Sequence, residues 1–212
     1  MNSSGYDPAA ASRRNWFARL AASFVLCAGL LAGAASDAGE PPKAARAGTV
    51  LDLTGHPIDP FRARDHAALV FIFISTDCPI SNRYAPEVRR LQSKYASRRI
   101  FFALVHADPT VSGAAVRKHA EEFQLSGEIL RDPAHVLVKK CRARVTPEAA
   151  VFTPDGQLAY RGRIDDRYVE LGKARPEART HDLADALEAI LAGKAIAARE
   201  TRAIGCSIPS AK

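Results

Sequence analysis

The stretch FIFISTDCPISNRYAPEV, residues 71–88, joins an apolar run to a polar segment with helical spacing. The run AALVFIFIS (67–75) is almost entirely apolar and rich in Val, Ile and Phe, which is typical of a strand buried on both faces. The following segment predicts a helix over 80–96, because four apolar residues recur at intervals of three and four: Tyr84, Val88, Leu91 and Tyr95. Cys78 therefore stands where a buried strand gives way to a helix.

This junction suits a reactive cysteine. The thiolate is the nucleophilic form, and the first turn of a helix stabilises it through unpaired N–H groups and the positive end of the helix dipole. Pro79 fits there because its missing N–H would be unpaired in any case. Asp77 acts against ionisation, and Arg83 or Arg163 could offset it. The alternative is that Cys78 is a small buried core residue, and we favour the reactive interpretation.

The remaining elements follow from local patterns. A hairpin is expected in GTVLDLTGHPIDPF (48–61) and a second buried strand in 99–108. Further along the chain we expect a helix at 112–125 with Ser112 as N-cap, a short strand at 128–133, a helix at 134–145, a hairpin of strands 149–153 and 158–162, a loop at 163–179, and a helix at 180–194 capped by Thr180. This order predicts a mixed sheet with helices on its faces.

Three local motifs in this order resemble the thioredoxin fold, and most closely the exported redoxin families that are peroxiredoxin-like (AhpC/TSA-like). Residues 75–81 (STDCPIS) with Ala85-Pro86-Glu87 resemble the active-site strand and helix of exported thioredoxin-like reductases. Val145-Thr146-Pro147-Glu148 resembles the cis-proline loop that faces the reactive cysteine, and FTPDG (152–156) resembles the family's late hairpin. The resemblance covers about residues 48–193. It implies an α/β, thioredoxin-like three-layer α/β/α sandwich with a mixed central sheet and an N-terminal β-hairpin extension.

The resemblance also implies the site. Cys78 is the expected nucleophile, with Ser75, Thr76, Thr146 and Pro147 beside it. A cis peptide bond is expected before Pro147, since X-Pro bonds are where cis peptides occur. The backbone of Thr146 could then pair with an extended substrate peptide.

The chain departs from both reference patterns. Ser81 occupies the position of the second cysteine of thioredoxins, so a disulfide within this motif is impossible. The peroxiredoxin pattern is incomplete as well, because Phe71 replaces its proline and Thr146-Pro147 stands where its arginine is usual. A resolving thiol must come from elsewhere, and Cys206 or Cys141 could serve. For Cys141 the interpretation as a buried helix residue is favoured. For Cys206, on a flexible-looking tail, the alternatives are a resolving thiol, a structural disulfide to Cys141, or a lone thiol.

The long loop after residue 162 should emerge near Cys78. We expect Arg163, Asp165 and Asp166 to shape a groove with Pro79 and Ser81, although a solvated surface insertion is an equal alternative. Two adjacent carboxylates without further ligands do not make a metal site, so no metal is expected, and no cofactor.

The N-terminus reads as a targeting signal. Arginines precede the short apolar run LAASFVLCAGLLAGA, and Ala32-Gly33-Ala34 offers a small-residue cleavage site. We therefore expect a signal peptide at 1–34, either twin-arginine or general secretory, a linker at 35–47, the redoxin domain at 48–193 and a tail at 194–212. Export places the protein in the periplasm or another extracytoplasmic space, with membrane contact only through an uncleaved N-terminal segment.

Composition narrows the partners. The net charge is +7, but the Lys and Arg residues are scattered and form no stripe interleaved with aromatic residues, so nucleic acid is not an expected partner. The first hypothesis is an exported thiol oxidoreductase that acts on a protein thiol, a disulfide or a peroxide and is recycled by a reducing partner protein. The alternative is a non-enzymatic binding module whose Cys78 forms only mixed disulfides with a partner.

Overall fold

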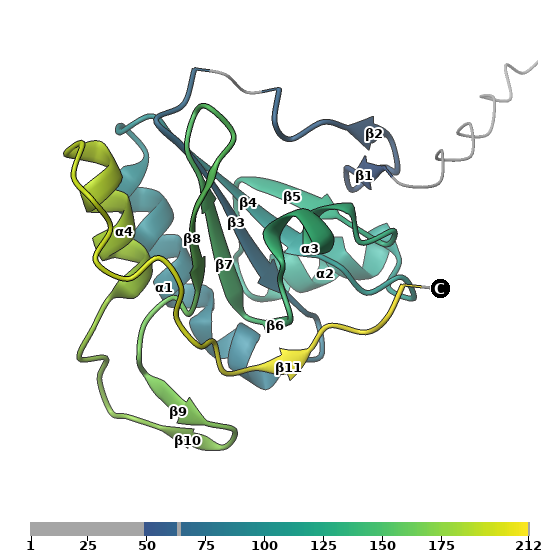
Figure 1. Ribbon diagram of the computed structural model, residues 1–212. Coiled ribbons are helices and arrows are strands. Elements are labelled where there is room, and N and C mark those ends of the chain that lie inside the picture. The colour runs from purple at the N-terminus through teal and green to yellow at the C-terminus, as the bar shows by residue number, and fades with distance from the viewer. Residues whose placement is uncertain (1–48, 63–64, 212) are drawn as a thin grey trace, which may run out of the picture. The chain divides into compact units, whose positions relative to one another are not determined.

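The computed structural model describes residues 49–62 and 65–211 (Figure 1). The expected signal peptide at 1–34 and linker at 35–47 lie outside the described residues. In the part of the chain that is described, no helix is both long enough and apolar enough to cross a membrane.

A seven-stranded mixed sheet forms the centre of the fold, in the order β2-β1-β5-β4-β3-β7-β8. The middle strands β3, β4 and β5 run parallel to one another, whereas the outer pairs are antiparallel. The strands are β1 (Val50–Leu51), β2 (Pro57–Ile58), β3 (Ala68–Ile74), β4 (Ile100–His106), β5 (Glu128–Arg131), β7 (Glu148–Phe152) and β8 (Leu158–Gly162). All seven residues of β3 are buried, as its unbroken apolar sequence predicts.

Helices cover both faces of this sheet. The helices α1 (Pro79–Tyr95), α2 (Gly113–Glu122) and α4 (Asp182–Leu191) pack their apolar sides into one core layer, and α1 lies beside α4 (Figure 1). The short helix α3 (Val136–Cys141) packs into the second layer on the opposite face. Alternate residues of β3 point into the two layers, as a pleated strand requires. The three-layer α/β/α sandwich with a mixed sheet is confirmed, as is the N-terminal hairpin of β1 and β2.

Two small strand pairs lie outside the central sheet. The first joins β6 (Val145–Thr146) to β11 (Cys206–Ser207), and the second is the hairpin of β9 (Tyr168–Glu170) and β10 (Lys173–Ala174). Figure 1 shows β11 running alongside β6, so the C-terminal segment returns to the body of the domain.

The structure differs from the expected elements in four places. The helix expected at 134–145 ends at Cys141, because Arg142 adopts a left-handed backbone and the chain turns into β6. The loop expected at 163–179 contains the hairpin of β9 and β10. The N-cap of α4 is His181, while the Thr180 hydroxyl donates to Asp182 at 2.7 Å. The tail looked flexible in sequence, yet it carries β11.

Candidate functional site

Cys78 is the N-cap residue of α1, directly before Pro79 in the first turn. Its own carbonyl accepts the first helical hydrogen bond, from the Asn82 N–H at 3.0 Å. An N-cap side chain normally accepts from an N–H of the first turn, so the sulfur occupies the place where a helix stabilises an anion. The sequence-based placement of Cys78 at the strand-to-helix junction is confirmed.

Two residues, Cys206 and Ser81, supply donors to the Cys78 sulfur. Burial alone raises the pKa of the Cys78 thiol, but hydrogen bonds from the thiol and N–H of Cys206 and from the N–H and hydroxyl of Ser81 outweigh it. Together they lower the pKa of Cys78 to about 7 from an ordinary value of 9.0. Ser81 thus replaces a second cysteine with a group that stabilises the thiolate.

The loop across from Cys78 carries the expected cis bond between Thr146 and Pro147. The Thr146 carbonyl oxygen lies 3.0 Å from the Cys78 sulfur and accepts a hydrogen bond from it when the thiol is protonated. Thr146 and Pro147 are both buried, so this loop forms one wall of the site.

Cys206 lies directly beside this loop. Its strand β11 pairs antiparallel with β6, and the register sets Cys206 against Thr146 and Ser207 against Val145. Burial raises the pKa of the Cys206 thiol, and its hydrogen bond to Cys78 raises it further, to about 11. The two thiols therefore form a hydrogen-bonded pair in which Cys78 ionises first. Neither thiol is in a disulfide.

Cys78 is much less accessible than the sequence led us to expect. Only 1% of its surface is exposed. The reason is the C-terminal segment, since Ile204 and Cys206 pack against the core layer that contains Cys78. With β11 in place, Cys206 is the thiol in contact with Cys78.

A hydrogen-bonded support holds the loop before Cys78. The Asn82 amide donates to the Thr76 carbonyl at 3.2 Å, and its oxygen is bonded to the His119 ring at 2.8 Å. The Ser75 hydroxyl accepts from the Asp77 N–H at 3.4 Å, so it stabilises the turn before Cys78. Sequence reasoning missed Asn82, although a polar residue one turn into a helix that starts at a reactive cysteine is a usable signal.

Arg161 connects the walls of the site. Its buried guanidinium donates to the Arg142 carbonyl at 2.7 Å and pairs with Glu148, 3.5 Å away, and with Glu200. Glu148 in turn accepts from the Arg144 and Val145 N–H groups. This network fixes the backbone leading into β6 and anchors the start of the C-terminal segment. Nothing in the sequence pattern marked Arg161, because its partners come from distant segments.

The expected groove residues lie on the loop that follows β8. Arg163 pairs with Asp182, with Nε 2.9 Å from Oδ2, so it is not free to offset Asp77. Asp166 accepts from the Arg179 and Thr180 N–H groups and pairs with Arg175. Asp165 accepts from the Tyr84 hydroxyl on α1. Arg163 and Asp165 share a very small cavity, of about 10 Å³, with Pro147.

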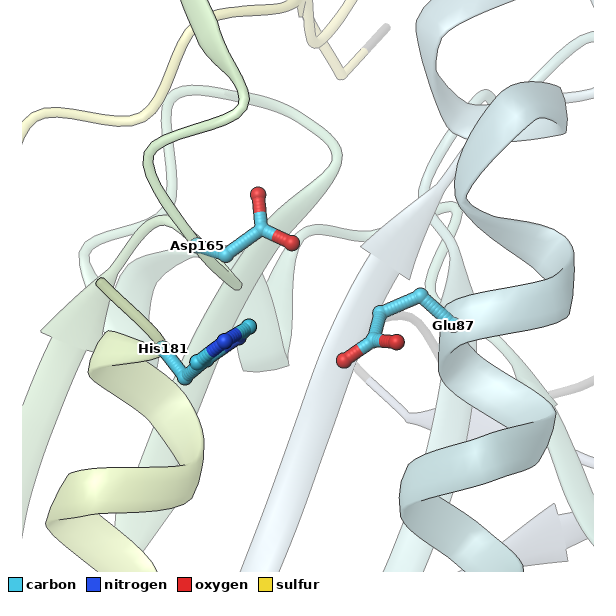
Figure 2. Close-up of side chains that lie close together, drawn as sticks. All are labelled: Glu87, Asp165 and His181. Atoms are coloured by element: carbon cyan, nitrogen blue, oxygen red, sulfur yellow. The ribbon is translucent and has the colours of Figure 1, made fainter. Parts of the chain in front are cut away.

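One cluster at this loop could in principle hold a cation. The nearest ligand atoms of Glu87, Asp165 and His181 lie within 4.8 Å of one another (Figure 2). Arg90, however, donates to both Glu87 oxygens, at 2.7 and 2.6 Å, and one Asp165 oxygen already accepts from Tyr84 and from the Arg167 N–H. A cation would have to displace the Arg90 guanidinium, so we assign these carboxylates to structural roles.

Cys141 lies apart from this site. It is fully buried at the end of α3, in the core layer on the other face of the sheet from Cys78. Burial raises the pKa of the Cys141 thiol well above its usual range, so its thiolate is scarce at neutral pH.

Comparison with solved structures identifies the architecture. A hypothetical protein of Sinorhizobium meliloti is 23% identical over 76% of this chain and 88% of its own, with a TM-score of 0.66. An uncharacterized conserved protein of Geobacillus kaustophilus is 26% identical over 79% and 90%, with a TM-score of 0.67. A candidate thiol:disulfide interchange protein DsbE of Chlorobium tepidum is 15% identical over 68% and 92%, with a TM-score of 0.53. No protein-family model and no curated protein matches the chain. The thioredoxin-like fold is thereby shown.

Proposed function

We propose that this thioredoxin-fold protein is an exported thiol oxidoreductase in which Cys78 is the nucleophile and Cys206 is the resolving thiol. The observation that carries the proposal is the position of Cys206, which the pairing of β11 with β6 sets against Thr146, whose carbonyl lies 3.0 Å from the Cys78 sulfur. The pKa is lowered to about 7 at Cys78 and raised to about 11 at Cys206, which supports this assignment. This asymmetry gives each sulfur a distinct role. The thiol of low pKa is ionised near neutral pH, and it is also the better leaving group.

The chemistry proceeds in two steps. The Cys78 thiolate attacks one sulfur of a substrate disulfide, a new S–S bond forms, and the other substrate sulfur leaves as a thiolate. Cys206 then loses its proton and attacks. Attack on Cys78 releases the substrate as a thiolate and leaves a disulfide between Cys78 and Cys206, so the substrate gains two electrons and the protein loses two. A reducing partner protein with a dithiol restores the resting state.

A peroxide substrate would use the same pair. The thiolate would attack a peroxide oxygen to give a sulfenic acid, and Cys206 would then form the same disulfide with loss of water. We favour disulfide exchange, because Thr146 and Pro147 occupy the wall where a peroxide-binding arginine is usual, and Arg163 is paired with Asp182. The Chlorobium tepidum structure, described as a thiol:disulfide interchange protein, supports the same preference.

The other sequence-based assignments take supporting places in this proposal. Ser81 stabilises the thiolate, Thr146 and Pro147 form the substrate-side wall, and Pro79 starts the helix. Ser75 and Thr76 shape the turn before Cys78. Cys141 has no redox role here, because the central sheet lies between its layer and that of Cys78. We further propose that residues 1–34 direct export.

A second candidate is a binding module that forms mixed disulfides without turnover, and the burial of Cys78 favours it over an enzyme because turnover needs repeated access by substrate and reductant. Turnover separates the two functions. Purified protein is offered a model protein disulfide and, separately, hydrogen peroxide, with a dithiol reductant in both cases. We expect disulfide turnover by the wild type and by the matched control Cys141→Ala, none by Cys78→Ser, and a stalled mixed disulfide in Cys206→Ser. Equal rates for the wild type and Cys78→Ser would eliminate the enzyme.

A further inference from the structure

The C-terminal segment is bound to the domain as a peptide would be. Cys206 and Ser207 pair antiparallel with Thr146 and Val145, and the Ile208 N–H donates to the Arg144 carbonyl at 3.0 Å. The Thr146 hydroxyl also lies 3.5 Å from the Cys206 carbonyl. Addition of an extended strand to a free sheet edge is a general mode of peptide recognition. Here the added strand carries a cysteine to the nucleophile.

The segment that leads into β11 is bound along β8, and the residues that follow Ile208 are exposed. Residues 199–201 lie along β8, where Thr201 bonds to the Arg161 carbonyl through its N–H and to the Tyr160 hydroxyl through its side chain. The last described residues, 209–211, are exposed. Between the anchor and β11 the chain borders a cavity of about 320 Å³, lined on this side by Glu200–Ala203. For another strand to reach β6, residues 202–208 must leave it and give up the packing of Ile204, Cys206 and Ile208, while the contacts of residues 199–201 with β8 can stay.

Gly205 shows what β6 requires of its partner. A Cβ atom at this position would overlap the Thr146 carbonyl oxygen and carbon and lie 3.1 Å from the Pro147 nitrogen. The φ angle of Gly205 is not in the left-handed region, so its backbone shape alone would admit other residues. The requirement for glycine comes from the close approach of two backbones, and the residue concerned directly precedes the cysteine.

We propose that the edge of β6 is a docking site for an extended segment of a client protein that carries glycine directly before its reactive cysteine, and that β11 occupies this edge until the client replaces it. The inference rests on the proposed function, and it specifies the substrate class. Clients are proteins with a disulfide in which one cysteine follows a glycine in extended backbone. In the first step Cys78 attacks that sulfur, the client S–S bond breaks, and the second client sulfur leaves as a thiolate.

The test uses the full chain with Cys206→Ser, because without the resolving thiol the mixed disulfide accumulates. Two peptides, IGCSI and IACSI, are each supplied as a mixed disulfide with thionitrobenzoate. Covalent capture of each peptide on Cys78 is followed by mass spectrometry. We expect IGCSI to be captured at least about tenfold faster, since forcing an extra methyl group into a packed contact is typically worth that much or more.

A second comparison tests the displacement of β11. In the same background, Gly205→Ala should push β11 off Thr146 and speed alkylation of Cys78 by a bulky maleimide several-fold. The matched control, Ser207→Ala on the exposed side of the same strand, should leave that rate unchanged.

The outcomes separate this inference from the proposed function. The reactivity of Cys78 itself is checked with the symmetrical disulfide of thionitrobenzoate, which carries no peptide. If Cys78 reacts with this small disulfide, then equal capture of the two peptides, or no effect of Gly205→Ala on alkylation, overturns the inference. Failure of Cys78 to react even with that small disulfide overturns the inference and the proposed function together.

Discussion

Replacement of Cys206 by alanine should raise the pKa of Cys78 by one to two units. The Cys206 thiol is the first of the donors that lower this pKa to about 7, and burial opposes all of them. A hydrogen bond to a charged group contributes about 1.5–3 kcal/mol, and one pKa unit corresponds to about 1.4 kcal/mol. The Ser81 donors remain, so we expect a pKa of about 8 to 9 in the variant. The thiolate fraction at pH 7 would then fall from about one half to about a tenth or less.

The pH dependence of the rate of Cys78 alkylation by a small reagent measures this shift. The midpoint is more informative than a rate at one pH, because a thiolate of higher pKa is intrinsically more nucleophilic and partly compensates for its lower population. In the wild type the first titration step belongs to the thiol pair. A peptide map of the alkylated protein shows that Cys78 is the residue modified.

Cys206→Ser is the matched control, because its hydroxyl keeps a donor near the sulfur. Its midpoint should lie between those of the wild type and Cys206→Ala. The reasoning is refuted if Cys206→Ala titrates at the wild-type midpoint, or if the wild type itself titrates near 9.

Three further predictions concern stability and the loop after β8. The Cys78 pKa is depressed in the folded state, so its thiolate stabilises the fold fully above pH 9, and this contribution is lost as the pH falls through 7. The free energy of unfolding of the reduced wild type, measured by denaturant, should exceed that of Cys78→Ser by an amount that grows by about 2.3 kcal/mol between pH 6 and pH 9, and a difference that does not change with pH would contradict the assignment. Asp166→Ala should speed tryptic cleavage within 167–179 because it removes the acceptor for two N–H groups, whereas unchanged cleavage would argue that the loop is held by other contacts. Tyr84→Phe should lower the free energy of unfolding by about 1–3 kcal/mol, since the buried Asp165 loses a donor, and an unchanged midpoint in urea would count against that bond.

The fold and half of the site could be predicted from local sequence. Buried strands such as β3 are unbroken apolar runs, and Cys78-Pro79 and Thr146-Pro147 carry strong local signatures of a helix start and a cis bond. These features depend on residues that are adjacent in the chain, so their signals survive in one sequence.

The other half depends on contacts between distant segments. The strand β11 has two residues and no periodicity, and it exists because its backbone pairs with Thr146. Gly205 looks like any tail glycine until the approach of that carbonyl is seen. The burial of Cys78, and the choice of Cys206 over Cys141 as its neighbour, follow from the same pairing. Contacts between segments that are distant in the chain produce no local sequence pattern from which they could be predicted.

Peptide mapping of the protein after mild oxidation tests the pairing of Cys78 with Cys206 most directly. The account predicts one intramolecular disulfide that links the peptides containing these two cysteines, with Cys141 recovered as a free thiol. A disulfide between Cys78 and Cys141, or a Cys78 that oxidises to sulfinic acid while Cys206 stays reduced, would contradict it.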